Sequence, residues 1–82
     1  MTLKDMHYIS LIAEEKSITK AAARLFVAQP ALSQCVQKVE RELGIPVFIR
    51  TASGVTLTAE GQRFLEFVYR TLHEEQQMKK EI

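Results

Sequence analysis

One stretch near the middle of the chain has both of its ends marked by residues that start or stop helices. Pro30 suits a first helical turn, where its missing N–H would be unpaired anyway, and Gly44 followed by Pro46 ends the stretch. On a helix the apolar residues between them share one face: Leu32, Cys35, Val36, Val39 and Leu43. The opposite face carries Pro30, Ser33, Gln34, Gln37, Lys38 and Arg41. The sequence therefore predicts an amphipathic helix over 30–44.

The flanking segments predict three more helices and a hairpin. Apolar residues recur at helical spacing over 3–16, and Ser17 is a typical N-cap for a second helix over 18–26. Short β-prone runs at 47–49 and 55–57 flank residues 50–54 and predict a small hairpin. Thr58 can cap a last helix that meets no proline before Ile82 and would be roughly 37 Å long.

These elements together predict a mainly α fold. We expect a winged helix-turn-helix, with three helices plus a small two-stranded β-hairpin wing, followed by a long C-terminal linker helix. The expected division is a winged helix-turn-helix domain over 1–58 and a long helix over 59–82. The last helix is too long for so small a body to cover.

The net charge of +1 is small, but the basic side chains are concentrated in one segment. From Lys16 to Arg50 six basic residues stand against two acidic ones, a balance of +4, whereas residues 1–15 sum to −2 and residues 51–82 to −1. Such a concentration favours a phosphate-facing surface, although a solvated helical face explains the charges equally well on this ground alone. Amide and hydroxyl groups on the 30–44 helix can also bond base edges.

Composition and motifs argue against several other classes. The chain is 46% apolar and 26% charged, which is ordinary for a globular domain. It contains no export signal and no apolar run of membrane length, so we expect a cytoplasmic protein with no membrane partner. With one Cys there is no disulfide framework, and Cys35 on the apolar face is expected to be a buried, inert thiol.

No residue pattern points to a metal, a cofactor or catalysis. His7 and His73 are isolated from other ligand-type residues at metal-like spacing, so surface histidines are expected and neither metal nor cofactor is. Glu74 and Glu75 are neighbours on a solvated helix and do not form a catalytic acid pair. There is no Gly-rich phosphate loop and no nucleophile elbow, so we do not expect an enzyme.

Five short blocks resemble the signature of LysR-type transcriptional regulators. They are AAARL at 21–25, AQPALS at 28–33, VERELG at 39–44, VFIRT at 47–51 and LTAEG at 57–61, in the family's order and spacing. The resemblance implies a bacterial transcription regulator that binds double-stranded DNA at a dyad-symmetric site as a homodimer. It also implies a C-terminal domain for a small-molecule effector that is absent here, so a chain ending in mid-helix at Ile82 is expected to be a fragment.

The resemblance and the polar face together give the expected DNA-binding residues. Three amide or hydroxyl side chains are expected to read bases and three cations to engage phosphate; the full set is Gln29, Pro30, Ala31, Ser33, Gln34, Gln37, Lys38, Arg41, Arg50 and Ser53. Three positions depart from the family's pattern. Ala28 lacks a capping hydroxyl, Gln34 replaces a common basic residue and favours adenine over guanine, and Ser53 replaces an Arg at the wing tip.

The last helix carries an apolar arc of about 200°, wider than one buried stripe requires. Leu65, Val68 and Leu72 have the spacing of a coiled-coil seam, and Phe67 and Met78 widen one edge. We expect one part of this arc to be buried against the winged helix-turn-helix and another part against a second copy of the chain. The expected dimer interface is Phe64, Leu65, Val68, Tyr69 and Leu72. A single wide contact within one subunit remains the alternative.

Two other functions stay open. A helical protein–protein interaction module without DNA binding would use the 64–72 surface and would not need Gln29, Ser33 or Arg50. A winged-helix regulator of another family, such as the MarR type, would bind DNA but is expected to have further helices at both ends of the domain.

Overall fold

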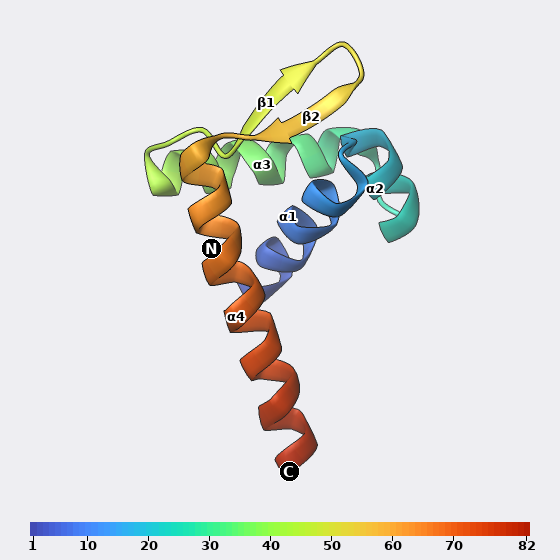
Figure 1. Cartoon of the computed structure of the whole chain (residues 1–82). Coiled ribbons are helices and arrows are strands. Elements are labelled where there is room, and N and C mark those ends of the chain that lie inside the picture. The colour runs from blue at the N-terminus through green and yellow to red at the C-terminus, as the bar shows by residue number, and fades with distance from the viewer.

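Four helices and one β-hairpin make up the fold (Figure 1). The structure is a computed structural model that describes residues 1–82. In chain order the elements are α1 (Leu3–Glu15), α2 (Ile18–Leu25), α3 (Gln29–Leu43), β1 (Phe48–Thr51), β2 (Gly54–Leu57) and α4 (Ala59–Glu81). The predicted mainly α fold, with three helices, a wing and a long last helix, is confirmed. No helix has both the length and the apolar character needed to cross a membrane.

Side chains cap three of the four helices at their N-termini. The Ser17 hydroxyl accepts the Lys20 amide at 3.1 Å, and the Thr58 hydroxyl accepts the Gly61 amide at 2.8 Å, so both predicted caps are confirmed. At the start of α1, Thr2 and Asp5 form a reciprocal capping box that sequence reasoning missed. These caps pair amides that the first turn of a helix otherwise leaves without a partner.

One hydrophobic core joins all the helices and the hairpin. Its most deeply buried side chains come from α1, α3, α4 and the strand entrance, namely Ile9, Ile12, Leu32, Val39, Val47 and Val68. The boundary expected between residues 58 and 59 coincides with the start of α4. The core nevertheless continues across that boundary, because the first turns of α4 pack into it.

The expected dimer interface needs correction for this reason. Leu65 is 2% exposed and Val68 is 0% exposed within one chain, so neither has surface left for a partner. Phe64 is also buried, and its ring stacks on that of Phe67 with 6.4 Å between centroids. Helical spacing alone could not separate a seam facing the chain's own core from one facing a partner. The exposed apolar side chains on α4 are instead Phe67, Tyr69 and Met78.

The hairpin is fixed at both of its ends. β1 and β2 pair antiparallel with Thr51 opposite Gly54, which leaves Ala52 and Ser53 at the tip. At the strand entrance the Glu40 carboxylate on α3 accepts the Val47 amide at 2.7 Å. Near the tip the Val55 amide donates to the Lys16 carbonyl at 3.0 Å, beside Gly54, where a Cβ would lie 2.2 Å from that same carbonyl oxygen. The wing therefore has a defined position relative to α1 and α3.

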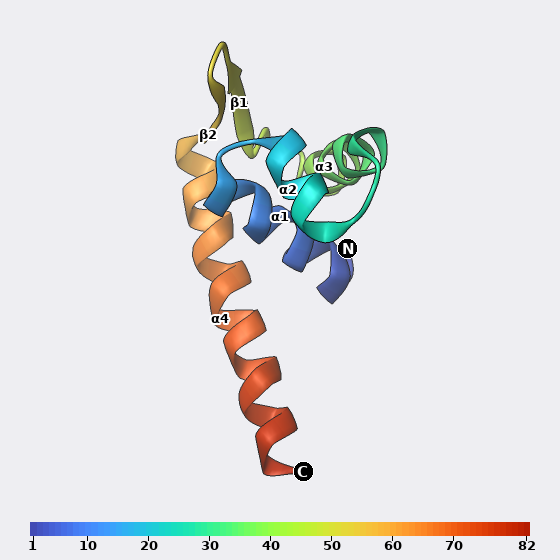
Figure 2. The same cartoon turned by 90° about the vertical axis from the view of Figure 1, so that its right-hand side faces the viewer.

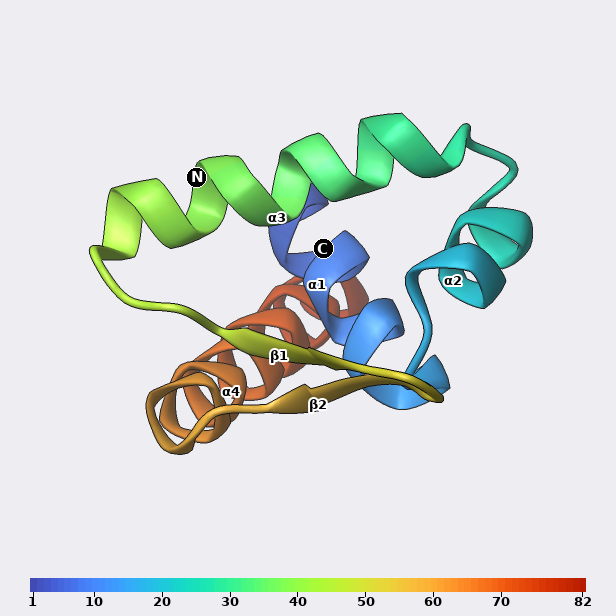
Figure 3. The same cartoon turned by 90° about the horizontal axis from the view of Figure 1, so that it is seen from above.

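These joints place α3 and the hairpin together at one end of an elongated molecule. The chain extends 44 × 27 × 19 Å, and α4 runs away from this end to the C-terminus at the other (Figures 1 and 2). Seen from above, α3 and the hairpin lie along two sides of the same face, with α2 beside the start of α3 (Figure 3). The surface expected to bind DNA and the surface expected to dimerise are thus on different parts of the chain.

Candidate nucleic-acid interface

The outer face of α3 presents most of the side chains that the sequence assigned to it. Six of the eight predicted residues on α3 are exposed, and Ser33 and Lys38 are partly buried; the exposed ones are Gln29, Pro30, Ala31, Gln34, Gln37 and Arg41. The Gln29 amide nitrogen donates to the Ser33 hydroxyl oxygen at 3.0 Å across one turn. This bond orients the two side chains together and leaves the Gln29 carbonyl oxygen and the Ser33 hydroxyl hydrogen available to a ligand.

No side chain covers the N-terminus of α3. Ala28 occupies the N-cap position in an extended conformation and makes no side-chain cap, as the departure at this position predicted. Pro30 removes one amide hydrogen from the first turn. The positive end of the helix dipole therefore faces solvent at the same end as Gln29 and Ser33, where it favours an anion.

A groove of about 220 Å³ joins the start of α3 to the wing and to α2. Gln29 lines it from α3, Arg50 from β1, and Ser17 and Thr19 from the start of α2. Arg50 and Ser53 are exposed, as expected for wing residues. The groove thus brings together a predicted base-reading side chain, a predicted phosphate-binding cation and the N-terminus of a second helix. Sequence reasoning missed Thr19, whose place beside the Ser17 cap was the available signal.

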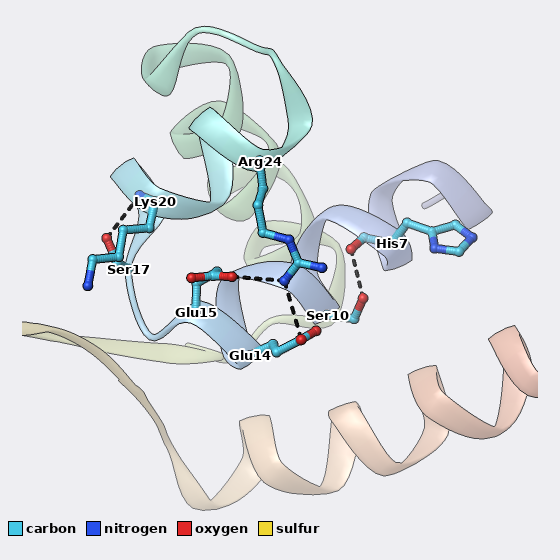
Figure 4. A network of polar contacts seen from close by, with 7 residues as sticks. All are labelled: His7, Ser10, Glu14, Glu15, Ser17, Lys20 and Arg24. Atoms are coloured by element: carbon cyan, nitrogen blue, oxygen red, sulfur yellow. Dashed lines mark hydrogen bonds and ion pairs between the residues drawn. The ribbon is translucent and has the colours of Figure 1, made fainter.

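Two of the six basic residues in the 16–50 segment are neutralised by acidic residues of α1. Arg24 on α2 lies 2.8 Å from a Glu15 carboxylate oxygen and 3.3 Å from one of Glu14, as Figure 4 shows. These hydrogen bonds, that to Glu15 first, raise the pKa of the guanidinium. Arg24 therefore braces α1 against α2, and its charge contributes less to the outer surface than the residue count implied.

Lys38 is the second neutralised cation. Its ammonium nitrogen lies 2.8 Å from Asp5 Oδ2 on α1, although the sequence predicted an engagement with phosphate. The other four basic residues of the segment make no ion pair: Lys16, Lys20, Arg41 and Arg50. Arg41 and Arg50 are therefore the predicted phosphate contacts whose charge is uncompensated.

Cys35 is buried on the inner face of α3, as predicted. Burial, and after it the nearby Asp5 carboxylate, raises the pKa of the thiol to about 11. A thiol with so high a pKa is protonated at neutral pH and reacts poorly as a nucleophile. His7 is exposed and lies 3.6 Å from Glu75 on α4, and no group of three or more ligand-type side chains is assembled anywhere in the chain.

Two acidic residues that position the interface were missed from the sequence. Asp5 holds Lys38, and Glu40 holds the start of β1 through the Val47 and Phe48 amides. Asp5 had a readable signal, because Thr2-Leu3-Lys4-Asp5 has the spacing of a capping box before an apolar run. The sequence held no such signal for Glu40, because its partners are backbone amides that the turn after Gly44 brings near.

Helices α2 and α3 joined by a short turn, with a hairpin beside α3, define the winged helix-turn-helix class. The sequence profile described as "Bacterial regulatory helix-turn-helix protein, lysR family" matches residues 3–62. The chain belongs to this family. The resemblance expected from the five sequence blocks is confirmed.

Several relatives are similar over most of the chain. The transcriptional regulator YcgK of Bacillus subtilis is 50% identical over 66 residues, which are 80% of this chain and 20% of that protein. BenM of Acinetobacter baylyi is 40% identical over 78 residues, 95% of this chain and 26% of that protein. The chain therefore spans about a quarter of the length of these curated relatives.

Solved structures of the family have the same fold. The BenM DNA-binding domain in complex with catB site 1 DNA has a TM-score of 0.92 at 39% identity, covering 98% of this chain and 86% of that one. The CbnR DNA-binding domain in complex with DNA has a TM-score of 0.93 at 32% identity, covering 99% and 93%.

Proposed function

We propose that this chain is the DNA-binding part of a bacterial LysR-type transcription regulator and binds double-stranded DNA through α3 and the wing. The observation that carries the proposal is the groove that brings Gln29 of α3 and Arg50 of the wing together. The solved complexes of the BenM and CbnR domains with DNA support the same use of this fold. A regulator of this kind acts in the cytoplasm by binding and not by catalysis.

We further propose a division of labour within the interface. Gln29, Ser33 and Gln34 read base edges in the major groove, because amide and hydroxyl groups can match the donors and acceptors found there. Arg41 and Arg50 engage phosphates, since their charges have no partner in the chain. Four further members of the predicted set line the approach to the duplex: Pro30, Ala31, Gln37 and Ser53. The tenth, Lys38, is paired with Asp5 on the flank of α3.

The proposed binding unit is a homodimer formed through α4, with residues 1–58 as the DNA-binding unit and 59–82 as the linker. Of the five interface residues expected, Tyr69 is 51% exposed and Leu72 is partly exposed, so these two remain available to a second copy. Phe67 and Met78 add exposed apolar surface on the other edge of α4. A two-fold dimer presents two copies of α3 and favours an inverted-repeat site. The full-length regulator would carry a further domain for a small-molecule effector.

Fluorescence anisotropy with labelled duplexes tests the division of labour. Arg50→Ala is expected to weaken binding to every sequence and to reduce the slope of log K against log salt by about 0.9. Gln34→Ala is expected to change the preference at one base pair, by about 1–3 kcal/mol. Arg70→Ala is the matched control, because Arg70 is an exposed cation on α4 that makes no ion pair.

Equal losses for Arg50→Ala and Gln34→Ala on every sequence would contradict this assignment. The dimer is tested separately by sedimentation velocity, in which Tyr69→Glu is expected to lower the apparent mass towards that of one chain. The interaction-module alternative predicts instead that no duplex is bound and that changes at Gln29, Ser33 or Arg50 leave function intact.

A further inference from the structure

Three side chains on one flank of α3 are held by the first residues of the chain. Cys35, Lys38 and Glu42 follow one another at intervals of three and four, so they form one row along the helix. The Cys35 thiol donates to Asp5 Oδ1 at 3.7 Å, and the Lys38 ammonium lies 2.8 Å from Asp5 Oδ2. The amino group of Met1 lies 2.7 Å from Glu42 Oε2. The first residues of the chain therefore hold α3, the helix that we propose reads DNA, by three polar contacts.

Asp5 is the centre of this arrangement. The residue is 8% exposed, the only buried residue in the chain that is charged, and both of its carboxylate oxygens are occupied. Besides Lys38 it accepts the Thr2 amide at 3.0 Å. Burial raises its pKa, but the hydrogen bonds from Lys38 and Thr2 outweigh burial and leave that pKa below its usual value. The carboxylate is therefore charged at neutral pH and depends on Lys38 for its compensation.

The position of Lys38 lets its ammonium group reach either the Asp5 carboxylate or a DNA phosphate. At about 100° per residue it lies roughly 80° from Pro30 around the helix, between the outward face and the buried face. Its side chain is 45% exposed, so the ammonium is open to solvent on one side while Asp5 holds it on the other. A flexible four-carbon stem lets the ammonium swing from the flank towards the outward face. Such a swing would leave the buried Asp5 carboxylate without its cation, which is unfavourable.

We propose that Asp5 is a positioning residue that holds Lys38 away from the DNA backbone and so limits sequence-independent binding. The inference rests on the proposed DNA-binding function and adds a restraint that lies outside the contact surface. Phosphate contacts contribute affinity without sequence information, so one cation withheld from them leaves a larger share of the binding free energy to base reading. Asp5 thereby raises the ratio of the affinity for a specific site to the affinity for non-specific DNA, without contacting DNA itself.

The test is a salt titration of binding to a non-specific duplex by three chains: the parent, Asp5→Asn, and Asp5→Asn combined with Lys38→Met. An asparagine oxygen can still accept the Thr2 amide, so the start of α1 stays capped. With Lys38 released, Asp5→Asn is expected to steepen the slope of log K against log salt by about 0.9 per chain, or about threefold in affinity between 50 and 200 mM salt. Adding Lys38→Met is expected to remove this gain. Glu66→Gln controls for net charge, because Glu66 is exposed on α4 and makes no ion pair.

An unchanged slope for Asp5→Asn, or a steeper slope that persists after Lys38→Met, would overturn the inference while leaving the proposed function intact. Absence of any binding by the parent chain would instead remove the proposed function, and this inference with it. A damaged fold would lower affinity and could not steepen the slope through Lys38 alone. A second measurement needs no variant: in the parent's DNA complex the Lys38 ¹⁵Nζ signal is expected to show no coupling to a ³¹P nucleus, and such a coupling would overturn the inference.

Discussion

Gly61 in the first turn of α4 is a position where the addition of one carbon should disturb the packing of the fold. A Cβ built there would lie 2.1 Å from the Val47 carbonyl oxygen, 2.9 Å from the Val47 carbonyl carbon and 3.0 Å from Thr58 Oγ1. An ordinary carbon–oxygen contact is roughly 3.3 Å, so α4 and the strand entrance would have to separate by about 1 Å. The same carbonyl accepts the Thr58 amide at 3.0 Å, and this bond would lengthen with the separation.

The expected cost of Gly61→Ala follows from three contributions. Overpacking at a buried site costs about 1–3 kcal/mol, and a weakened buried hydrogen bond costs about 1 kcal/mol. The better helix propensity of Ala offsets at most about 1 kcal/mol of this. A net loss of about 2 kcal/mol should lower the melting temperature of a domain of this size by about 8–16 °C.

Thermal unfolding followed by circular dichroism measures the effect, with Gly44 as the matched control. Gly44 has a φ of +73° and nothing within 4 Å of an added Cβ, so Gly44→Ala meets only the cost of the left-handed backbone, about 1 kcal/mol. Asn tolerates that conformation, so Gly44→Asn should recover part of the loss, whereas Gly61→Asn should be no better than Gly61→Ala. A Gly61→Ala chain that melts at or above the parent's temperature would show that the added Cβ does not clash with the Val47 carbonyl.

Three further predictions concern other positions. Phe26 ends α2 with a φ of 56° and is 96% exposed, so Phe26→Asn should relieve backbone strain without loss of any buried apolar contact. The free energy of unfolding measured in urea should rise by about 0.5–1 kcal/mol. Cys35, whose thiol pKa is raised to about 11 by burial and by Asp5, should react with an alkylating reagent at neutral pH about a hundredfold more slowly than the unfolded chain does. Because the pKa of Asp5 is depressed on folding, its contribution to stability is present above the unfolded value and is lost as the pH falls through the folded one. The difference in unfolding free energy between the parent and Asp5→Asn should therefore shrink below about pH 4.

Most of the fold could be predicted because the sequence marks its element boundaries with residues of fixed local chemistry. Ser17 and Thr58 cap helices as expected, and Gly44 takes the left-handed conformation that ends α3. These effects depend on a few neighbouring residues, and no tertiary contact overrides them. Three of the five blocks that carry the family resemblance fall on helix ends: AQPALS at the start of α3, VERELG at its end and LTAEG at the start of α4.

The tertiary partners of individual side chains could not be predicted in the same way. Leu65 and Val68 have the spacing of a dimer seam, yet that spacing equally suits packing on the chain's own core, where both are buried. Lys38 belongs to the polar face of α3 by its helical position, but Asp5, more than thirty residues earlier, fixes where its charge lies. The spacing of apolar residues shows which face of a helix is buried, but it does not show which part of the chain or of a partner covers that face.

In the function proposed above, α3 and the wing of a dimer bind an operator with two-fold symmetry. The most direct test is selection of bound duplexes from a random DNA pool, followed by anisotropy titration of the enriched sequence at several salt concentrations. We expect enrichment of an inverted repeat, bound by two chains, with an affinity that falls as salt rises. Failure to enrich any sequence, together with no binding at low salt, would contradict it.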